Sequence, residues 1–316
     1  METGEDPEAV FNEVLNRQKT VSAVQDTGID FFSDIDGFFE DGKRIKARKT
    51  KTGFPKLDKF MEGGMDPGTL TVFMAPPKFG KTTILTNVGY ANLIRGKKVA
   101  HISLELSARK AQRKYICRIT NIPSGRLPRK QRKANKLLSR FKKRWGGQLK
   151  LKFYPTGSVH VGVLRSYLYS LRNRDGFNPD LVVVDYGDIL MPTSKRKDSE
   201  TDDYHGQGNV YEGLRALASE LDCPVVTASQ CKRAAATKVT IRMEDIADSY
   251  RKVAVADHII TLCRTEDETA KNRGRLFFAG SREAETWRWV PIRYNWKTSL
   301  IAEVHYDPEE DDEDGV

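Results

Sequence analysis

The pattern that constrains this chain most is an apolar run that passes directly into a loop containing glycine and lysine. Residues 70–74 predict a buried strand, and apolar residues at helical spacing over 84–91 predict a helix. A strand, Ala75-x-x-x-x-Gly80-Lys81-Thr82 and a helix in this order predict a phosphate-binding P-loop, because backbone N–H groups there form an anion cradle. Lys81 is expected to reach the β- and γ-phosphates, and Thr82 to bind Mg²⁺. The residues expected to contact nucleotide are Ala75, Pro76, Pro77, Lys78, Phe79, Gly80, Lys81, Thr82 and Thr83.

Beyond this loop, strand patterns alternate with helix patterns. Strands are predicted over 98–104, 149–153, 181–185 and 224–228, and helices over 108–121, 161–173 and 206–221. Such alternation predicts an α/β fold with a mainly parallel sheet and helices on both faces. Ligands of such sheets collect at the carboxyl ends of the strands.

Three polar residues stand at those predicted strand ends. Asp185 closes an apolar strand in the manner of a Walker B carboxylate and is expected to hold Mg²⁺ through water or with Thr82. Glu105 is placed to polarise the water that attacks the γ-phosphate, and a surface glutamate is the alternative. Gln230 is placed to hydrogen-bond the γ-phosphate or the attacking water, and an ordinary surface amide is its alternative.

Length and composition fit one large domain with small appendages. The chain has 316 residues, 39% of them hydrophobic and 30% charged. No apolar run approaches the ~20 residues of a membrane span, and the acidic N-terminus is not typical of a signal peptide. We therefore expect a cytoplasmic protein of a bacterium or its host cell, without membrane contact. Its four scattered cysteines are expected to be reduced and buried.

Three regions are expected along the chain: 1–50, 51–306 and 307–316. The first contains a short amphipathic helix that begins at Asp6-Pro7-Glu8. It then continues over residues 20–51 as a linker with a few anchoring aromatic residues. The second is the main domain, and the third is a disordered acidic tail.

Charge is unevenly distributed along the chain. The net charge is +10, yet no Asp or Glu occurs from Leu106 to Arg174. This segregation indicates a surface that faces a polyanion, together with the acidic tail. A solvated face and a solubilising tail are the alternative interpretation.

Eight short patterns then occur in a fixed order over about four-fifths of the chain. They are Thr52-Gly53-Phe54-x-x-Leu57-Asp58, the P-loop through Thr83, Ser103-Leu104-Glu105-Leu106-Ser107, Val184-Asp185-Tyr186, Leu214-x-x-Leu217-Ala218-x-x-Leu221, Pro224-Val225-Val226, Ser229-Gln230 and Ala256-Asp257-x-Ile259-Ile260. With these patterns the chain resembles the ATPase domain of the DnaB-type hexameric replicative DNA helicases, within the RecA-like P-loop NTPase group. That group combines the parallel core with late antiparallel strands.

The resemblance implies a homo-hexameric ring that binds ATP and Mg²⁺ between subunits and translocates 5′ to 3′ on single-stranded DNA. Lys81 and Thr82 would hold the phosphates and the metal, Asp185 the metal, Glu105 would be the general base and Gln230 the sensor. Arg282, in Ala279-Gly280-Ser281-Arg282, matches the family's trans-acting arginine finger, although Gly280 stands where the family has lysine. An ordinary arginine at a strand end is the alternative.

This chain departs from the family in two other features. The strand-binding loop has Ile246-Ala247-Asp248-Ser249-Tyr250 where the family has Leu-Arg-Glu-Ser-Gly. No counterpart of the family's N-terminal primase-binding collar is recognised, so residues 1–20 are expected to act as the linker helix, and a phage or plasmid origin is expected. Primase, a loader or a polymerase are expected partners through the termini. The candidate DNA contacts, in this loop and two other stretches, are Lys195, Arg196, Lys197, Lys232, Arg233, Tyr250, Arg251 and Lys252.

Two other functions remain compatible with the residues. One is a RecA-like recombination or annealing filament, in which ATP switches DNA affinity without unwinding. The other is a regulatory ATPase of the KaiC type that binds protein and no DNA. Ring or filament shape and DNA-stimulated ATP turnover discriminate among the three.

Overall fold

A computed structural model describes residues 28–192, 202–245 and 254–304. Within these ranges the strands form one nine-stranded sheet of order β3-β2-β4-β5-β1-β6-β7-β8-β9. The first six strands in this order are parallel, and β7, β8 and β9 are antiparallel. This arrangement confirms the expected parallel core with late antiparallel strands. The strands are β1 Leu70–Ala75, β2 Lys98–Ser103, β3 Gln148–Phe153, β4 Leu181–Asp185, β5 Val225–Gln230, β6 His258–Cys263, β7 Arg273–Ser281, β8 Arg288–Asn295 and β9 Leu300–Glu303.

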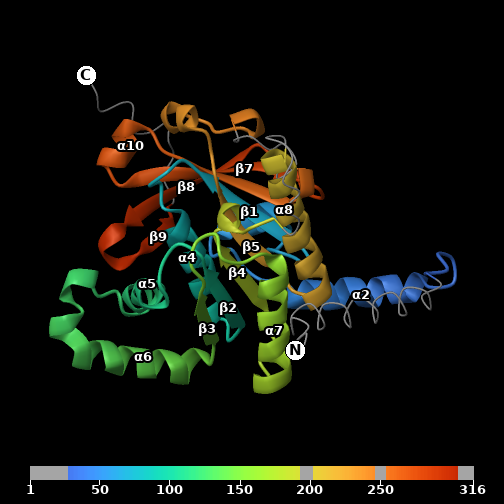
Figure 1. Ribbon diagram of the computed structural model, residues 1–316, viewed down its shortest axis with the longest axis horizontal. Coiled ribbons are helices and arrows are strands. Elements are labelled where there is room, and N and C mark those ends of the chain that lie inside the picture. Colours follow the sequence, from blue (N-terminus) through green and yellow to red (C-terminus); the bar gives the residue numbers. More distant parts are fainter. Residues whose placement is uncertain (1–27, 193–201, 246–253, 305–316) are drawn as a thin grey trace, which may run out of the picture.

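Helices cover both faces of the sheet, as Figure 1 shows. The helices α4 and α5 lie on one face, and α7 and α8 lie on the other. The α-helices are α2 Ile35–Arg48, α3 Pro55–Phe60, α4 Lys81–Leu93, α5 Ala108–Thr120, α6 Gln131–Trp145, α7 Val161–Asp175, α8 Asp202–Leu221 and α10 Glu266–Ala270.

The central strands pack two separate cores because alternate side chains of a strand point to opposite faces. In β4, Val182 and Val184 join the core beneath α7 and α8. Leu181 and Val183 join the core beneath α4 and α5. Every residue of β4 is buried, which explains why its first four residues are all apolar rather than alternating with polar ones.

The sequence pattern that starts at Thr52 stabilises the segment before β1 and does not lie at the strand ends. The Thr52 backbone N–H and hydroxyl both donate to Asp58 Oδ1 at 2.7 Å. Gly53 has φ of +91°, and a Cβ there would lie 2.7 Å from the Ala91 Cβ on α4. This pattern therefore anchors the entry segment against the P-loop helix.

The structure corrects the expectation for residues 20–51. Residues 35–48 form the helix α2, which extends away from the body of the molecule. Phe38 and Phe39 are 72% and 60% exposed, so these aromatic side chains do not anchor the segment to the described chain. The earlier helix expected at Asp6 and the acidic tail lie outside the described residues.

Two further differences concern helices. The basic segment contains α6, which the sequence patterns did not anticipate. Helix α8 begins at Asp202 rather than at Gly206. None of the helices described is both long and apolar enough to cross a membrane. All four cysteines are free and buried, as expected.

Candidate nucleotide site

The predicted site residues of four adjacent strands meet at one edge of the sheet. Strand pairing places Ala75 beside Gln230, at the ends of β1 and β5. It also places Ser103 beside Asp185, at the ends of β2 and β4. Glu105 follows the end of β2 by two residues. The strand order β2-β4-β5-β1 therefore brings the P-loop, Asp185, Glu105 and Gln230 to the same edge.

The P-loop enters α4 through residues in the left-handed region. Gly80 has φ of +104°, and a Cβ at this position would lie 3.0 Å from the Trp296 ring. The positive φ therefore favours glycine, and a Cβ would in addition have to displace the Trp296 ring slightly. The Lys81 ammonium lies 3.5 Å from the Ala75 carbonyl and 5.4 Å from the centre of the Tyr186 ring. Burial lowers the pKa of Lys81, while Glu105, Asp188 and other acidic groups oppose this change.

Asp185 and Thr82 form the centre of the site. The Thr82 hydroxyl donates to Asp185 Oδ1 at 3.2 Å. Burial raises the pKa of Asp185 to about 7, although the Thr82 hydroxyl opposes this rise and Glu105 adds to it. The other carboxylate oxygen, Oδ2, is buried and has no hydrogen-bond partner among the described residues. A buried carboxylate oxygen without a partner suits a hard cation or its water, so these residues fit Mg²⁺.

Glu105 and Lys114 complete the charged groups around this carboxylate. Glu105 is exposed. Lys114 extends from α5, and its ammonium donates to the Thr83 hydroxyl at 3.1 Å. Burial lowers the pKa of Lys114, against the opposing effects of Asp185, Cys117 and Glu105. No sequence signal distinguished Lys114 from the other cations of the basic segment.

Gln230 is held in place by a second carboxylate that the sequence analysis missed. Asp188 accepts from the Gln230 backbone N–H at 2.8 Å and from the Ser229 hydroxyl at 3.0 Å. It also accepts from the Tyr211 hydroxyl of α8 at 2.7 Å. Asp188 thus couples the end of β5 to α8. Its position three residues after Asp185 was the available signal.

An aromatic cluster borders the P-loop and was also missed. The rings of Tyr294 and Trp296 stack with centres 4.7 Å apart. The Arg264 guanidinium lies 4.5 Å from the Tyr294 ring centre. These two rings line a cavity of about 490 Å³ together with Arg293, Lys297 and neighbouring residues. Tyr294 and Trp296 are separated by one residue, and in an extended chain such residues point to the same face. This spacing was an available sequence signal.

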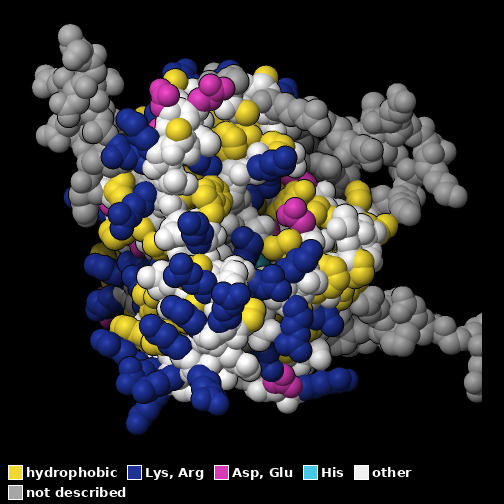
Figure 2. Space-filling model, turned by 90° about the vertical axis from the view of Figure 1, so that its left-hand side faces the viewer, with side chains coloured by type: hydrophobic (Ala, Val, Ile, Leu, Met, Phe, Trp, Pro, Cys, Tyr) yellow, Lys and Arg dark blue, Asp and Glu magenta, His cyan; other side chains and the backbone are white. Residues whose placement is uncertain are grey.

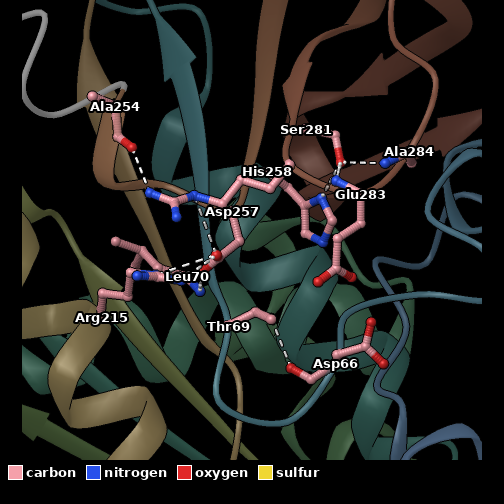
Figure 3. A network of polar contacts seen from close by, with 11 residues as sticks. Asp66, Thr69, Leu70, Arg215, Ala254, Asp257, His258, Ser281, Glu283 and Ala284 are labelled. Atoms are coloured by element: carbon pink, nitrogen blue, oxygen red, sulfur yellow. Dashed lines mark hydrogen bonds and ion pairs between the residues drawn. The ribbon is translucent and has the colours of Figure 1, made fainter. Parts of the chain in front are cut away.

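Arg282 lies at the opposite edge of the sheet from the P-loop. Its Nη2 donates to the Ala254 carbonyl at 2.7 Å, and its Nε is 3.6 Å from Asp257 Oδ1. Figure 3 shows the Asp257 carboxylate at the centre of this network, where it also binds Arg215 and the Leu70 N–H. Leu70 begins β1 and the P-loop follows its end, roughly 16 Å away at about 3.3 Å per residue. Arg282 therefore cannot reach the nucleotide of its own subunit.

The candidate DNA contacts are only partly described. Lys232 is exposed and lies two residues after the end of β5. Arg233 begins a 3₁₀ turn, and its side chain lies outside the described part. The others, Lys195, Arg196, Lys197, Tyr250, Arg251 and Lys252, lie outside the described residues.

The strand order, the P-loop after β1 and the carboxylates at the ends of β2 and β4 define a RecA-like P-loop NTPase. Within this class, the chain belongs to the DnaB-like helicase C-terminal domain family, whose model matches residues 50–299.

Known proteins similar to this chain extend the comparison. The DnaB-like replicative helicase of Enterobacteria phage T4 is 29% identical over 279 residues, which cover 82% of this chain and 58% of that protein. The chain thus spans little more than half the length of this relative. One solved ATPase domain superposes with a TM-score of 0.72 at 20% identity, covering 89% of this chain and all of that one. A DnaB-like replicative helicase, described with its interactions with primase, superposes with a TM-score of 0.71 at 20% identity, covering 95% and 74%. These two structures establish the fold alone.

Proposed function

We propose that this chain is the motor of a replicative DNA helicase that hydrolyses ATP between subunits and translocates on single-stranded DNA as a hexameric ring. The observation that carries the proposal is the division of the site between two edges of the sheet. The phosphate and metal residues lie at one edge, and the candidate arginine finger lies at the other. A head-to-tail neighbour would bring the two edges together.

Each residue of the nucleotide site has a proposed role. Lys81 and the N–H groups at the start of α4 bind the phosphates. Thr82 and Asp185 hold Mg²⁺, which neutralises charge on the phosphate oxygens when bound. Glu105 takes the proton of the attacking water, and Gln230 senses the γ-phosphate. We add the Trp296 ring as a platform for the base, because it lies against Gly80 and faces the adjoining cavity.

Two features support assembly into a ring. Arg282 lines a cavity of about 360 Å³ with Arg215 and Glu212. Its guanidinium would reach the phosphates of a neighbouring subunit after exchanging its contact with Asp257 for a contact with them. Helix α2 exposes Phe38 and Phe39, whose rings pack edge to face with centres 5.4 Å apart. Apolar side chains of this size favour burial against a second copy. We therefore propose that α2 docks on the adjacent subunit, in addition to the role expected for residues 1–20, which lie outside the described residues.

The DNA and protein partners rest on family membership. Loops that follow β4 and β5 would carry the strand contacts, with Lys232 and the predicted basic residues on the phosphates. Primase, a loader or a polymerase would dock on segments outside the ATPase core.

The decisive experiment measures ATP turnover with and without single-stranded DNA, for the wild type and for Glu105→Gln. We expect stimulation by DNA and a loss of about 10²- to 10⁴-fold in the variant, with ATP binding retained, because only the proton acceptor is removed. Electron microscopy of the same samples should show closed rings rather than filaments. Unchanged turnover in Lys81→Ala would refute the nucleotide site, and DNA-independent turnover would refute the motor.

A further inference from the structure

Helix α6 concentrates positive charge to an unusual degree. Its sequence, QRKANKLLSRFKKRW, contains seven Lys or Arg among 15 residues and no acidic residue. Ala134 is buried, and Leu137, Leu138 and Phe141 are half-buried on the same side. The helix therefore packs one apolar stripe against the body, and its cations occupy the remaining surface.

Four of these cations form a regular row, which we call the α6 stripe: Arg132, Lys136, Arg140 and Arg144. Their spacing of four residues places them on one side of the helix, about 6 Å apart along its axis. All four are exposed, and in the ranges described none forms an ion pair with a carboxylate. Like charges at this spacing repel one another and destabilise a helix. An anionic partner would relieve that repulsion.

The surroundings of the stripe are basic as well. Figure 2 views the molecule from the left-hand side of Figure 1, where α5 and α6 lie in the lower part. Lys and Arg side chains gather over this lower part, with few Asp or Glu. Arg129 and Lys130 precede α6, and both are exposed. Trp145 at the end of α6 is 39% exposed, and the Arg144 guanidinium lies 4.8 Å from the centre of its ring.

The α6 stripe and helix α8 lie on opposite sides of the sheet. Helix α6 packs on α5, which lies on the same face of the sheet as α4. Helix α8, which begins at Asp202, five residues after the predicted contact Lys197, covers the opposite face. The sheet therefore lies between the α6 stripe and the start of α8.

We propose that the α6 stripe binds the phosphate backbone of DNA as a second contact, distinct from the translocating loops. The inference rests on the proposed function, which supplies the DNA. Three of the four cations are arginines, whose planar guanidinium groups can donate two parallel hydrogen bonds to the oxygens of one phosphate. Trp145 adds a ring on which an unpaired base can stack. A long row of one sign, without acidic residues interspersed, suits a regular polyanion better than a mixed protein surface.

The test compares two variants of equal charge change in the full chain. The stripe variant carries Arg132→Gln, Lys136→Gln, Arg140→Gln and Arg144→Gln. The control variant removes four exposed cations from other surfaces: Lys59→Gln, Arg172→Gln, Arg174→Gln and Lys271→Gln. Binding of a labelled forked DNA is measured by fluorescence anisotropy over a series of salt concentrations. Thermal melting and light scattering establish that each variant folds and assembles as the wild type does.

We expect the slope of log K against log salt to fall by up to about 2.8 to 3.6 in the stripe variant, because each of four phosphate contacts contributes about 0.7 on single-stranded DNA and about 0.9 on duplex DNA. The control should keep the wild-type slope. Equal slopes in the two variants would overturn the proposal, as would loss of assembly in the stripe variant, which would assign the stripe to a subunit contact. Binding of a peptide of residues 307–316 to the wild type but not to the stripe variant, with equal DNA slopes, would assign it to the acidic segment instead.

Failure of this inference is distinct from failure of the proposed function. If the inference alone fails, the wild type still binds DNA and its ATP turnover still responds to DNA. If the proposed function fails, the wild type itself shows neither response.

Discussion

Replacing Asp185 by asparagine distinguishes the loss of folding stability caused by a buried carboxylate from the role of that carboxylate in binding Mg²⁺. Asn keeps an oxygen that accepts from the Thr82 hydroxyl, and it presents an uncharged group where Oδ2 has no partner. The variant therefore resembles the protonated acid. We expect Asp185→Asn to stabilise the protein without nucleotide or metal, while it abolishes Mg²⁺-dependent ATP turnover.

The size of the stabilisation follows from the pKa. Burial raises the pKa of Asp185 from 3.8 to about 7. A carboxyl whose pKa is raised in the folded state holds its proton more tightly there, so stability is lost as pH rises from about 4 to about 7. At about 1.36 kcal/mol per tenfold change in proton affinity, the full cost above pH 7 is about 4 kcal/mol. Near pH 5 only about 2 kcal/mol of that cost is present.

Urea unfolding in EDTA, followed by tryptophan fluorescence near pH 5 and near pH 8, measures this difference. The advantage of Asp185→Asn over the wild type should grow by about 2 to 3 kcal/mol between the two conditions. Asp267→Asn, at an exposed carboxylate of α10, serves as the control and should show no such growth. An advantage that is equal at both pH values, or that shrinks as pH rises, would refute the reasoning.

Three further outcomes are expected. Arg282→Ala should lower ATP turnover about 10³-fold or more. Mixing this variant with the inactive Lys81→Ala variant should restore part of the turnover, because one kind of mixed interface combines an intact P-loop with an intact Arg282. No restoration would exclude a role of Arg282 in trans. Trp296→Ala should raise the KM for ATP about tenfold with kcat largely kept, since stacking of a base is worth about 1–3 kcal/mol; an unchanged KM would place the base elsewhere. The double change Phe38→Ser and Phe39→Ser should shift the protein toward monomer in analytical ultracentrifugation, and an unchanged distribution would refute the role of α2.

Local signals were sufficient for the residues that act at strand ends. A P-loop needs only a strand, a short loop and a helix in sequence, and Asp185 closes a strand whose buried neighbours are all apolar. In a parallel sheet, strands of one direction end at one edge. The order of motifs was therefore enough to predict the fold class and the meeting of Lys81, Asp185 and Glu105.

Tertiary structure decided what depends on contacts between distant segments. Trp296 reaches Gly80 only because β8 and the turn after it fold back over the P-loop, and Lys114 stands out from its basic neighbours only because α5 turns it toward Thr83. The placement of Arg282 opposite the P-loop follows from the antiparallel pairing of β7 with β6. Helix α2 was missed although Ile35, Phe38 and Phe39 stand at helical spacing, because Gly37 and Gly42 lower the helix propensity of this charged segment. Only the tertiary structure shows that this segment is helical and that Phe38 and Phe39 are exposed.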